Sequence, residues 1–204
     1  MDFVLFLITA LALIISLIRE IRKRGSDSIG VVVWKYFSYY TTLSNFLVLV
    51  WFAALTFGSE HSVTQFAKNP NVATAITFYI VTVGIANYLI YGWLKLSLFE
   101  RISDFLVHAV TPVVTLSYWF FFVEKTQLQY SYLGYWLIFS LTYAAYTMSH
   151  GKWTKFYPYE FTNVQAIGLN RVLLNGLVLS ISLLVGGALF IFLRKLLANS
   201  NSAL

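Results

Sequence analysis

A carboxylate and an imidazole stand four residues apart at Asp104 and His108. On a helix this spacing puts both side chains on one face, where the carboxylate would fix the histidine tautomer and favour its protonated form. Thr42 and Asn45, three residues apart, share a helix face in the same way. Acyl transfer needs a hydroxyl, a histidine base, an orienting acid and an amide donor. We therefore predict that Thr42 attacks an acyl carbon, that His108 takes its proton, and that Asn45 or Asn170 donates to the oxyanion.

Further polar side chains are predicted at the same depth of a membrane. Counted at about 1.5 Å per residue from the predicted inner helix ends, five helices bring polar groups to one layer in the inner half of the bilayer. The supporting members of this layer are Ser44, Asn45, Asn87, Asp104, Asn170 and Arg171. Arg171 cannot readily lose its proton, and Asp104 is the acid best placed by depth to pair with it. Ionisable groups inside a membrane mark functional sites, so the layer predicts a polar pocket open toward the inner leaflet.

Helix packing is the alternative explanation of this layer. Thr, Ser and Asn side chains commonly tie membrane helices together, at about 0.6 kcal/mol each, and His108 alone is equally consistent with a core histidine. Thr41 points about 100° away from Thr42 on a helix and is a rival nucleophile, as is Ser44. Pro112 leaves the carbonyl of His108 without its helical donor, which predicts either a bend at the pocket or an ordinary kink.

The helices that position these residues follow from composition. The chain has 204 residues, of which 59% are hydrophobic and only 11% charged, against about 25% charged in soluble domains. A soluble protein of this length has too little interior for so much apolar surface, so the bilayer must be its solvent. A spanning helix needs about 20 apolar residues, and continuous apolar runs exclude the alternation of a β-barrel. Six stretches qualify, roughly residues 3–18, 34–57, 72–93, 104–123, 132–148 and 164–193.

The sequence therefore predicts an all-α integral membrane protein, a single-domain bundle of six transmembrane helices with short loops. The first stretch is short, because 16 residues rise about 24 Å, so it needs a thinned bilayer or snorkelling ends. Nine of the 14 Lys and Arg residues fall in the first, third and fifth loops. The positive-inside rule then places those loops in the cytoplasm and both termini outside the cell membrane.

Several classes of function are disfavoured. The net charge of +6 does not indicate nucleic acid, because the basic residues flank spans, where orientation and anionic lipid explain them. The chain has no cysteine, which removes disulfides and thiolate chemistry. The three histidines lie far apart and no nucleotide-binding motif occurs, so we predict neither a metal nor a cofactor.

Three motifs in order along the chain resemble a known family. They are Trp34-Lys35-Tyr36-Phe37 with Thr42-Leu43-Ser44-Asn45, then His108-Ala109-Val110-Thr111-Pro112, then Phe156-Tyr157-Pro158-Tyr159-Glu160-Phe161. They resemble the androgen-induced, FAR-like membrane proteins and, more closely, the bacterial six-span Pr-six-Pr integral membrane family, over nearly the whole chain. Glu160 departs from the pattern, since bacterial relatives often have a second proline there. Animal members hydrolyse fatty-acid esters of hydroxy fatty acids with a threonine and a histidine, roles that the resemblance carries to Thr42 and His108.

The predicted function is thus an intramembrane hydrolase of such esters or similar lipids, with membrane lipids as its partners. An acyltransferase is a close variant, because an alcohol can capture the acyl-enzyme in place of water. Two alternatives belong to other classes. A transporter or channel for a small or lipid-like solute would line its path with Arg171 and His108, although no inverted repeat is visible. A non-catalytic lipid-binding or scaffold protein would use the polar layer only for packing.

Overall fold

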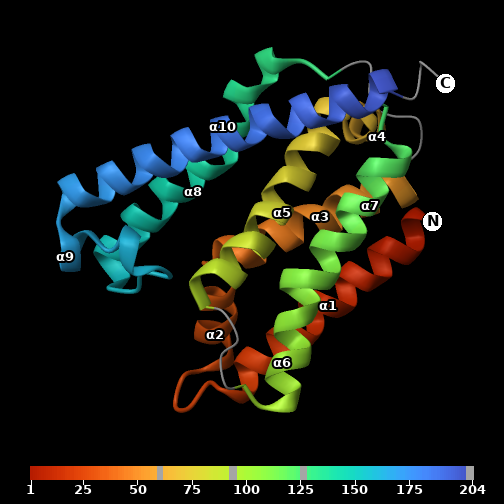
Figure 1. Ribbon diagram of the computed structural model, residues 1–204. Helices are drawn as coiled ribbons and strands as arrows, with labels where there is room; N and C mark the ends of the chain where they lie inside the picture. Colours follow the sequence, from red (N-terminus) through yellow and green to blue (C-terminus); the bar gives the residue numbers. More distant parts are fainter. Residues whose placement is uncertain (59–61, 92–95, 125–127, 201–204) are drawn as a thin grey trace. The chain divides into compact units, whose positions relative to one another are not determined.

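The computed structural model describes residues 1–58, 62–91, 96–124 and 128–200. These residues are almost entirely helical and contain no β-strand, which confirms the all-α class. The helices form two compact units, unit 1 over residues 1–124 and unit 2 over residues 125–204, and Figure 1 labels their elements. The prediction of a single domain stays a prediction. Lys95, Lys125 and the end of the predicted span 72–93 lie outside the described residues.

Unit 1 contains the candidate chemistry. Its elements are α1 (Asp2–Arg22), α2 (Ile29–Tyr36), α3 (Tyr40–Phe57), α4 (Ser62–Lys68), α5 (Pro70–Tyr91), α6 (Leu98–Phe105), the π-helix η1 (Leu106–Val110) and α7 (Thr111–Phe122). α1 runs antiparallel to α3, since the rings of Phe3 and Phe6 at its beginning meet the edge of Phe57 at the end of α3. An apolar cluster that includes Leu5, Val48, Phe52 and Ile80 joins α1, α3 and α5.

The first helix is longer than the predicted span. α1 has 21 residues, which rise about 32 Å and match the roughly 30 Å hydrocarbon core of a bilayer. The helix is therefore longer than the predicted 16 residues and needs neither a thinned bilayer nor snorkelling ends to span it. The helix continues beyond residue 18 because Arg19 and Arg22 lie in its last turn, where cations interact favourably with the helix dipole.

The predicted span 34–57 is divided between two helices. Ser28 caps α2 by accepting a hydrogen bond from the backbone N–H of Val31. After α2 ends at Tyr36, the Ser38 hydroxyl donates to the carbonyl of Trp34 at 2.9 Å, a local bond that competes with continued helix. The membrane-crossing part therefore begins at Tyr40, which places Thr42 in the first turn of α3 and Asn45 in the second.

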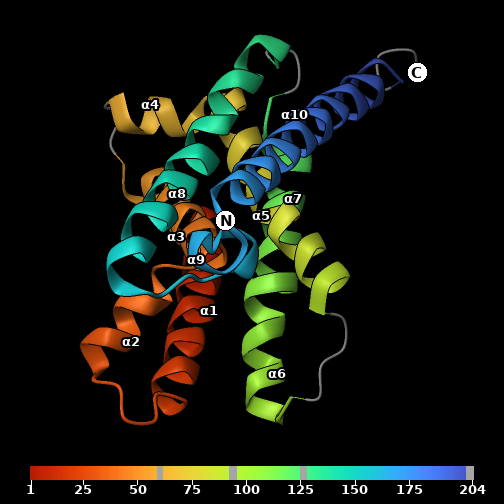
Figure 2. The same cartoon turned by 90° about the vertical axis from the view of Figure 1, so that its left-hand side faces the viewer.

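The predicted span 104–123 begins earlier than expected. Ser97 and Glu100 form a capping box at the start of α6, and α6, η1 and α7 together make one candidate span over residues 98–122. Figure 2 shows the Arg22 end of α1 and the beginning of α6 at the same end of unit 1, and these helices contact each other. Lys23 forms an ion pair with Glu100 there, and Arg22 stacks over the ring of Phe99 at 4.5 Å.

Unit 2 consists mainly of two long helices. Its elements are the 3-10 helix η2 (Tyr130–Tyr132), α8 (Leu133–Thr154), the 3-10 helix η3 (Glu160–Thr162), α9 (Val164–Ile167) and α10 (Leu169–Ser200). Gly187 of α10 packs so closely on α8 that an added Cβ would lie 2.9 Å from a Leu133 methyl group and 3.1 Å from the Trp136 ring. The absence of a side chain at Gly187 thus allows α8 and α10 to pack together.

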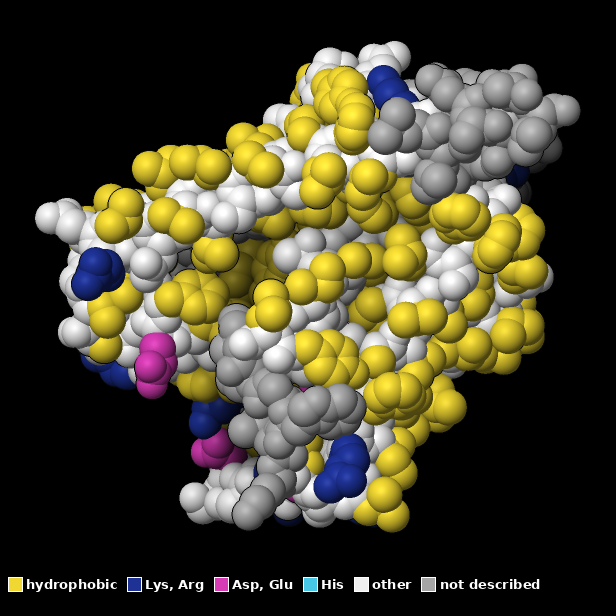
Figure 3. All heavy atoms as spheres, viewed as in Figure 1, with side chains coloured by type: hydrophobic (Ala, Val, Ile, Leu, Met, Phe, Trp, Pro, Cys, Tyr) yellow, Lys and Arg dark blue, Asp and Glu magenta, His cyan; other side chains and the backbone are white. Residues whose placement is uncertain are grey.

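Five described helices are long and apolar enough to cross a membrane. They cover residues 2–22, 40–57, 70–89, 98–122 and 169–193. Hydrophobic side chains are spread widely over the face in Figure 3, whereas charged side chains occupy only a few places on it. This surface is that of a multi-pass membrane protein, because exposed apolar side chains are solvated by lipid and not by water. The sixth predicted span, within α8, is not among the five.

Candidate functional site

The side chains of Asp104 and His108 are in contact in unit 1. His108 Nδ1 lies 2.9 Å from Asp104 Oδ1, with side-chain exposures of 11% and 31%. The same nitrogen lies 3.2 Å from the backbone oxygen of Asp104. When Nδ1 carries a proton toward Asp104, Nε2 presents a lone pair, the tautomer that a general base requires. No hydrogen bond to Nε2 occurs within the described residues.

The histidine lies in a π-helical turn. η1 spans Leu106–Val110, and the Leu106 carbonyl accepts from the backbone N–H of Thr111 and from its hydroxyl at 3.1 Å. Pro112 has no N–H for the carbonyl of His108, four residues earlier. That carbonyl faces Gly84 of α5, where an added Cβ would lie 2.7 Å from His108 O. Single π-turns within α-helices are frequent at functional sites, and this one sets the position of the imidazole.

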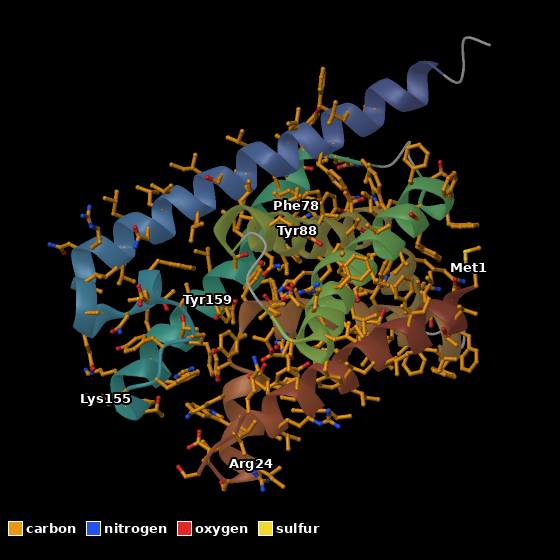
Figure 4. All side chains as sticks on the ribbon, turned by 60° about the horizontal axis from the view of Figure 1, so that its bottom comes forward. Met1, Arg24, Phe78, Tyr88, Lys155 and Tyr159 are labelled. Carbon is orange, nitrogen blue, oxygen red and sulfur yellow. The ribbon has the colours of Figure 1, made fainter. Side chains whose placement is uncertain are left out.

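Two residues from other helices act on the carboxylate of Asp104, one through a hydrogen bond and one through its charge. Asn87 Nδ2 of α5 donates to Asp104 Oδ2 at 3.4 Å, so the predicted supporting role of Asn87 has a direct contact. Arg19 of α1 lies within electrostatic range of the same carboxylate. Figure 4 shows α1 running between the labelled residues Met1 and Arg24, and it contacts both α6 and η1.

Thr42 contacts a tyrosine. Its hydroxyl and that of Ser16 lie within reach of the Tyr36 hydroxyl, which donates to the Leu13 carbonyl at 3.0 Å. Burial raises the pKa of Tyr36, and the Ser16 and Thr42 hydroxyls oppose that rise. Thr42 is 6% exposed, and no hydrogen bond between Thr42 and His108 is present in the described part of the chain.

Asn45 ties α3 to the π-turn. Its Nδ2 donates to the Thr41 carbonyl at 2.9 Å and to the Val107 carbonyl at 3.3 Å. The second bond brings α3 to the residue before His108, as the predicted common layer requires. Asn45 Oδ1 and Ser44 Oγ are buried and have no hydrogen-bond partner among the described residues. Asn45 therefore uses both amide hydrogens on carbonyl groups and has none left for an oxyanion.

Asn170 and Arg171 belong to unit 2 and lie at the beginning of its long helix. The predicted span 164–193 placed them two to three turns inside the membrane, whereas α10 begins at Leu169. The difference arises at Gly168, whose φ of 79° interrupts the helix after the Asn163-capped turn of α9. Both side chains are exposed, and an arginine in the first turn of a spanning helix reaches the interface easily. The predicted depth of these two residues is therefore wrong.

Arg19 and Tyr36 were missed as site residues from the sequence. Arg19 stood in a predicted loop because the first span ended too early, and Tyr36 was one of many aromatic residues near the interface. The helix periodicity offered a signal for Arg19, since Leu13, Ser16 and Arg19 recur at intervals of three residues on one face. No group of three His, Asp or Glu side chains placed to hold a metal ion occurs in the residues that the structure describes.

Comparison with protein-family models, with curated proteins and with solved structures finds no match in any of the three. The resemblance of the three sequence motifs thus remains an expectation. What the site can do follows from its own residues: a carboxylate-held imidazole, a threonine and an asparagine on a facing helix, and an arginine within electrostatic range of the carboxylate.

Proposed function

We propose that this chain is an intramembrane hydrolase of lipid esters. The observation that carries the proposal is the contact at 2.9 Å between His108 Nδ1 and Asp104 Oδ1, inside a candidate membrane span. Charged groups are costly in hydrocarbon and are kept there for function. An imidazole whose Nδ1 is held by a carboxylate acts as a base through Nε2.

The proposed reaction passes through an acyl-threonine. Thr42 Oγ1 bonds to the ester carbonyl carbon while its proton passes to Nε2 of His108. The tetrahedral intermediate expels the alcohol, which takes that proton from the imidazolium. Water then attacks the acyl-threonine in the same way, releasing the fatty acid and restoring the Thr42 hydroxyl. An alcohol in place of water gives acyl transfer.

Thr42 must exchange its partner for this reaction. Its hydroxyl lies within reach of the Tyr36 hydroxyl, and catalytic hydrogen bonds often tighten only when substrate binds. The proposal assigns Thr42 as the nucleophile on the motif resemblance, with Thr41 and Ser44 as rivals. Fatty-acid esters of hydroxy fatty acids, which enter laterally from the bilayer, are the proposed substrates.

The same proposal includes the topology. α8 is a sixth span, because its 22 residues rise about 33 Å and residues 128–151 contain no Asp, Glu, Lys or Arg. Its many Tyr, Ser and Thr residues lower its mean hydropathy. With six spans and the basic loops inside, both termini lie outside the cell membrane.

Active-site labelling in membranes tests the function. A long-chain fluorophosphonate, which reacts with activated hydroxyl groups, should label the wild-type chain and Thr41→Ala but neither Thr42→Ala nor His108→Ala. Each variant is first shown to be folded at the temperature of the labelling experiment. Equal labelling of Thr42→Ala and wild type would show that Thr42 is not the nucleophile. If neither a short-chain nor a long-chain probe labels the folded wild type, the proposed hydrolase is wrong.

A non-catalytic lipid-binding or scaffold role is the second candidate. It is favoured by the contacts of Thr42 and Asn45, which go to Tyr36 and to backbone carbonyls between helices. Under this alternative, Thr42→Ala lowers the unfolding temperature but leaves lipid binding and the cellular phenotype intact. The labelling experiment separates the two candidates, because a packing threonine does not react with the probe.

A further inference from the structure

The short helix α4 packs against the side of α3. The Trp51 indole N–H donates to the Ala67 carbonyl at 2.9 Å, and Trp51 lies about 9 Å along the axis before α3 ends at Phe57. Ala67 is 4% exposed and belongs to the apolar cluster that joins α1, α3 and α5. The end of α4 is therefore held against a residue that lies inside a candidate membrane span.

A second contact holds the first turn of α4. The Thr64 hydroxyl lies 3.5 Å from the Ala54 carbonyl oxygen of α3. An added Cβ on Gly58, directly after α3, would overlap with the same hydroxyl, so the chain passes very close to Thr64 there. Thr64 and Ala67 are both 4% exposed, and at a spacing of three residues they form the face of α4 that packs on the protein.

The exposed part of α4 has an apolar side and a polar side. Val63 is 67% and Phe66 is 66% exposed, and these two residues share a helix face because they are three apart. Ser62 and Gln65 are also exposed. At about 100° per residue, this polar pair points about 100° away from the apolar pair. An apolar side beside a polar side is typical of a helix that lies in the interface of a membrane.

The place of α4 in the fold is that of an interfacial helix. It lies between α3 and α5 in the chain and contacts both. Both neighbours are candidate spans, so the end of α3 and the beginning of α5 lie at the same membrane surface. Figure 1 shows α4 end-on while α1 and α7 are seen lengthwise, and in Figure 2 α4 lies across their direction. α4 thus runs along the membrane surface.

We propose that Val63 and Phe66 insert into the bilayer just below the lipid head groups, so that α4 anchors this end of unit 1 at the membrane surface. The partner is lipid because the apolar surface continues that of a span: Phe57, the last residue of α3, is 64% exposed. Acyl chains remove such side chains from water. The inference does not depend on the proposed hydrolase, because none of these residues belongs to its site.

Spin labels on single cysteines test the insertion. The chain has no cysteine, so Phe66→Cys, Gln65→Cys and Val50→Cys each carry one nitroxide in the full-length chain, placed in phosphatidylcholine vesicles. Power-saturation EPR compares collisions with oxygen, which concentrates in the bilayer, and with a water-soluble nickel chelate. The label at Phe66→Cys should lie about 5–10 Å below the head groups.

Two controls accompany this measurement. Gln65 is exposed and adjacent to Phe66, so its label should collide mainly with the nickel chelate. Val50 lies within α3 and is 47% exposed, so its label should collide mainly with oxygen. The Val50 label thus tests the span itself, separately from α4.

Removing the indole bond gives a second readout. Trp51→Phe frees the Ala67 carbonyl, so α4 should loosen and the label at Phe66→Cys should collide more with the nickel chelate. Trp119→Phe is the matched control. It loses another buried indole bond, to the Thr74 hydroxyl at 2.8 Å, which does not involve α4, so the depth of the label should stay unchanged.

Three results would overturn the insertion. The first is a label at Phe66→Cys that collides with the chelate as often as the label at Gln65→Cys, while Val50→Cys is protected. The second is protection of Phe66→Cys from both oxygen and chelate, which would mean that protein, such as a second copy of the chain, covers this side of α4. The third is exposure of all three labels to the chelate, which would show that α3 does not span. An equal depth in Trp51→Phe and Trp119→Phe would overturn the holding role of Trp51.

Discussion

At the scale of single residues, the chemistry depends on which nitrogen of His108 is held. Asp104 Oδ1 contacts Nδ1 of His108, and Asn87 contacts the second carboxylate oxygen of Asp104. Both oxygens of the carboxylate thus have a partner, which fixes the acid and with it the imidazole. A histidine that served only as core packing would not need this arrangement.

Replacing Asp104 with Asn should abolish most of the reaction. The amide keeps the size of the carboxylate but turns the imidazole to the wrong tautomer and no longer stabilises the imidazolium. We expect labelling by the fluorophosphonate to slow by about 10²- to 10⁴-fold, the contribution typical of general-base catalysis. Glu100→Gln, which breaks the pair with Lys23 one turn earlier, is the control and should label normally. Normal labelling of Asp104→Asn would mean that His108 works without an orienting acid.

Replacing Tyr36 with Phe should destabilise the chain while freeing Thr42. The variant loses a buried hydroxyl that donates to Leu13 and contacts Thr42, at a cost of about 1–2 kcal/mol. Thermal unfolding in detergent measures the cost, and Tyr135→Phe, whose side chain is 66% exposed, should unfold like the wild type. Because the Thr42 hydroxyl then lacks its competing partner, labelling should become faster. Slower labelling in a folded variant would show that Tyr36 positions the nucleophile instead.

The sequence predicted the local part of this site better than the part that depends on tertiary contacts. Asp104 and His108 are one helical turn apart, so their proximity follows from helix geometry alone. The partners of Thr42 and Asn45 come from α2 and η1, and no spacing in the sequence encodes those contacts. Arg19 was missed for a related reason, because a charged residue near the end of an apolar run marks either a loop or the last turn of a helix.

At the scale of elements, the π-turn and α5 determine where His108 lies. The carbonyl of His108 lacks its helical donor and faces Gly84, where only a residue without a side chain fits. η1 contacts α1, α3, α5 and α7. A shift of α5 would therefore move the backbone of His108 and change the position of its imidazole.

Replacing Gly84 with Ala tests this coupling. The new Cβ would lie 2.7 Å from His108 O and 3.2 Å from Pro112 Cγ, so the backbone of α5 or η1 must move. We expect a loss of about 1–3 kcal/mol in stability, as for other overpacked sites, together with slower labelling. Gly176→Ala, with no atom within 4 Å of its Cβ, should leave both unchanged or raise stability slightly. An unaltered unfolding temperature in Gly84→Ala would contradict the close approach.

The residues at which helices begin and end were harder to predict than the presence of the helices. The apolar content of each long helix marks it clearly, whereas the ends depend on single side chains. Ser38 bonds back to Trp34 and separates α2 from α3, and Gly168 adopts a positive φ before α10. Both residues looked like ordinary members of a predicted span, and the depths of Asn170 and Arg171 were misplaced as a result.

At the scale of the whole molecule, charge and apolar surface are segregated. The basic residues of α1 and the acidic residues that pair with them lie at the end of unit 1 that includes α6. Apolar residues dominate the exposed side chains of the long helices. This segregation favours insertion in one orientation, with the charged end at one membrane surface.

Single-cysteine labelling tests the orientation and the sixth span. The chain has no cysteine, so each introduced thiol reports alone, and Ser26, Ser131 and Thr154 are exposed. A membrane-impermeant maleimide should modify Ser131→Cys in intact cells, and Ser26→Cys and Thr154→Cys only after permeabilisation. Equal accessibility of Ser131→Cys and Thr154→Cys would show that α8 does not cross. The reverse pattern would show that the chain has six spans in the orientation opposite to the predicted one.

The π-turn also bears on how this chain can vary over evolution. A hydrogen bond that reaches back five residues, as from Thr111 to Leu106, encloses one residue more than an α-helical turn. Deleting one residue between Leu106 and Val110 would restore an ordinary α-helix and keep the faces of α6 and α7 in register with their neighbours. Insertions and deletions are normally confined to loops, but the π-turn should allow the loss of one residue within this helix. An alignment that forbids gaps in helices would then mispair the residues on one side of this turn.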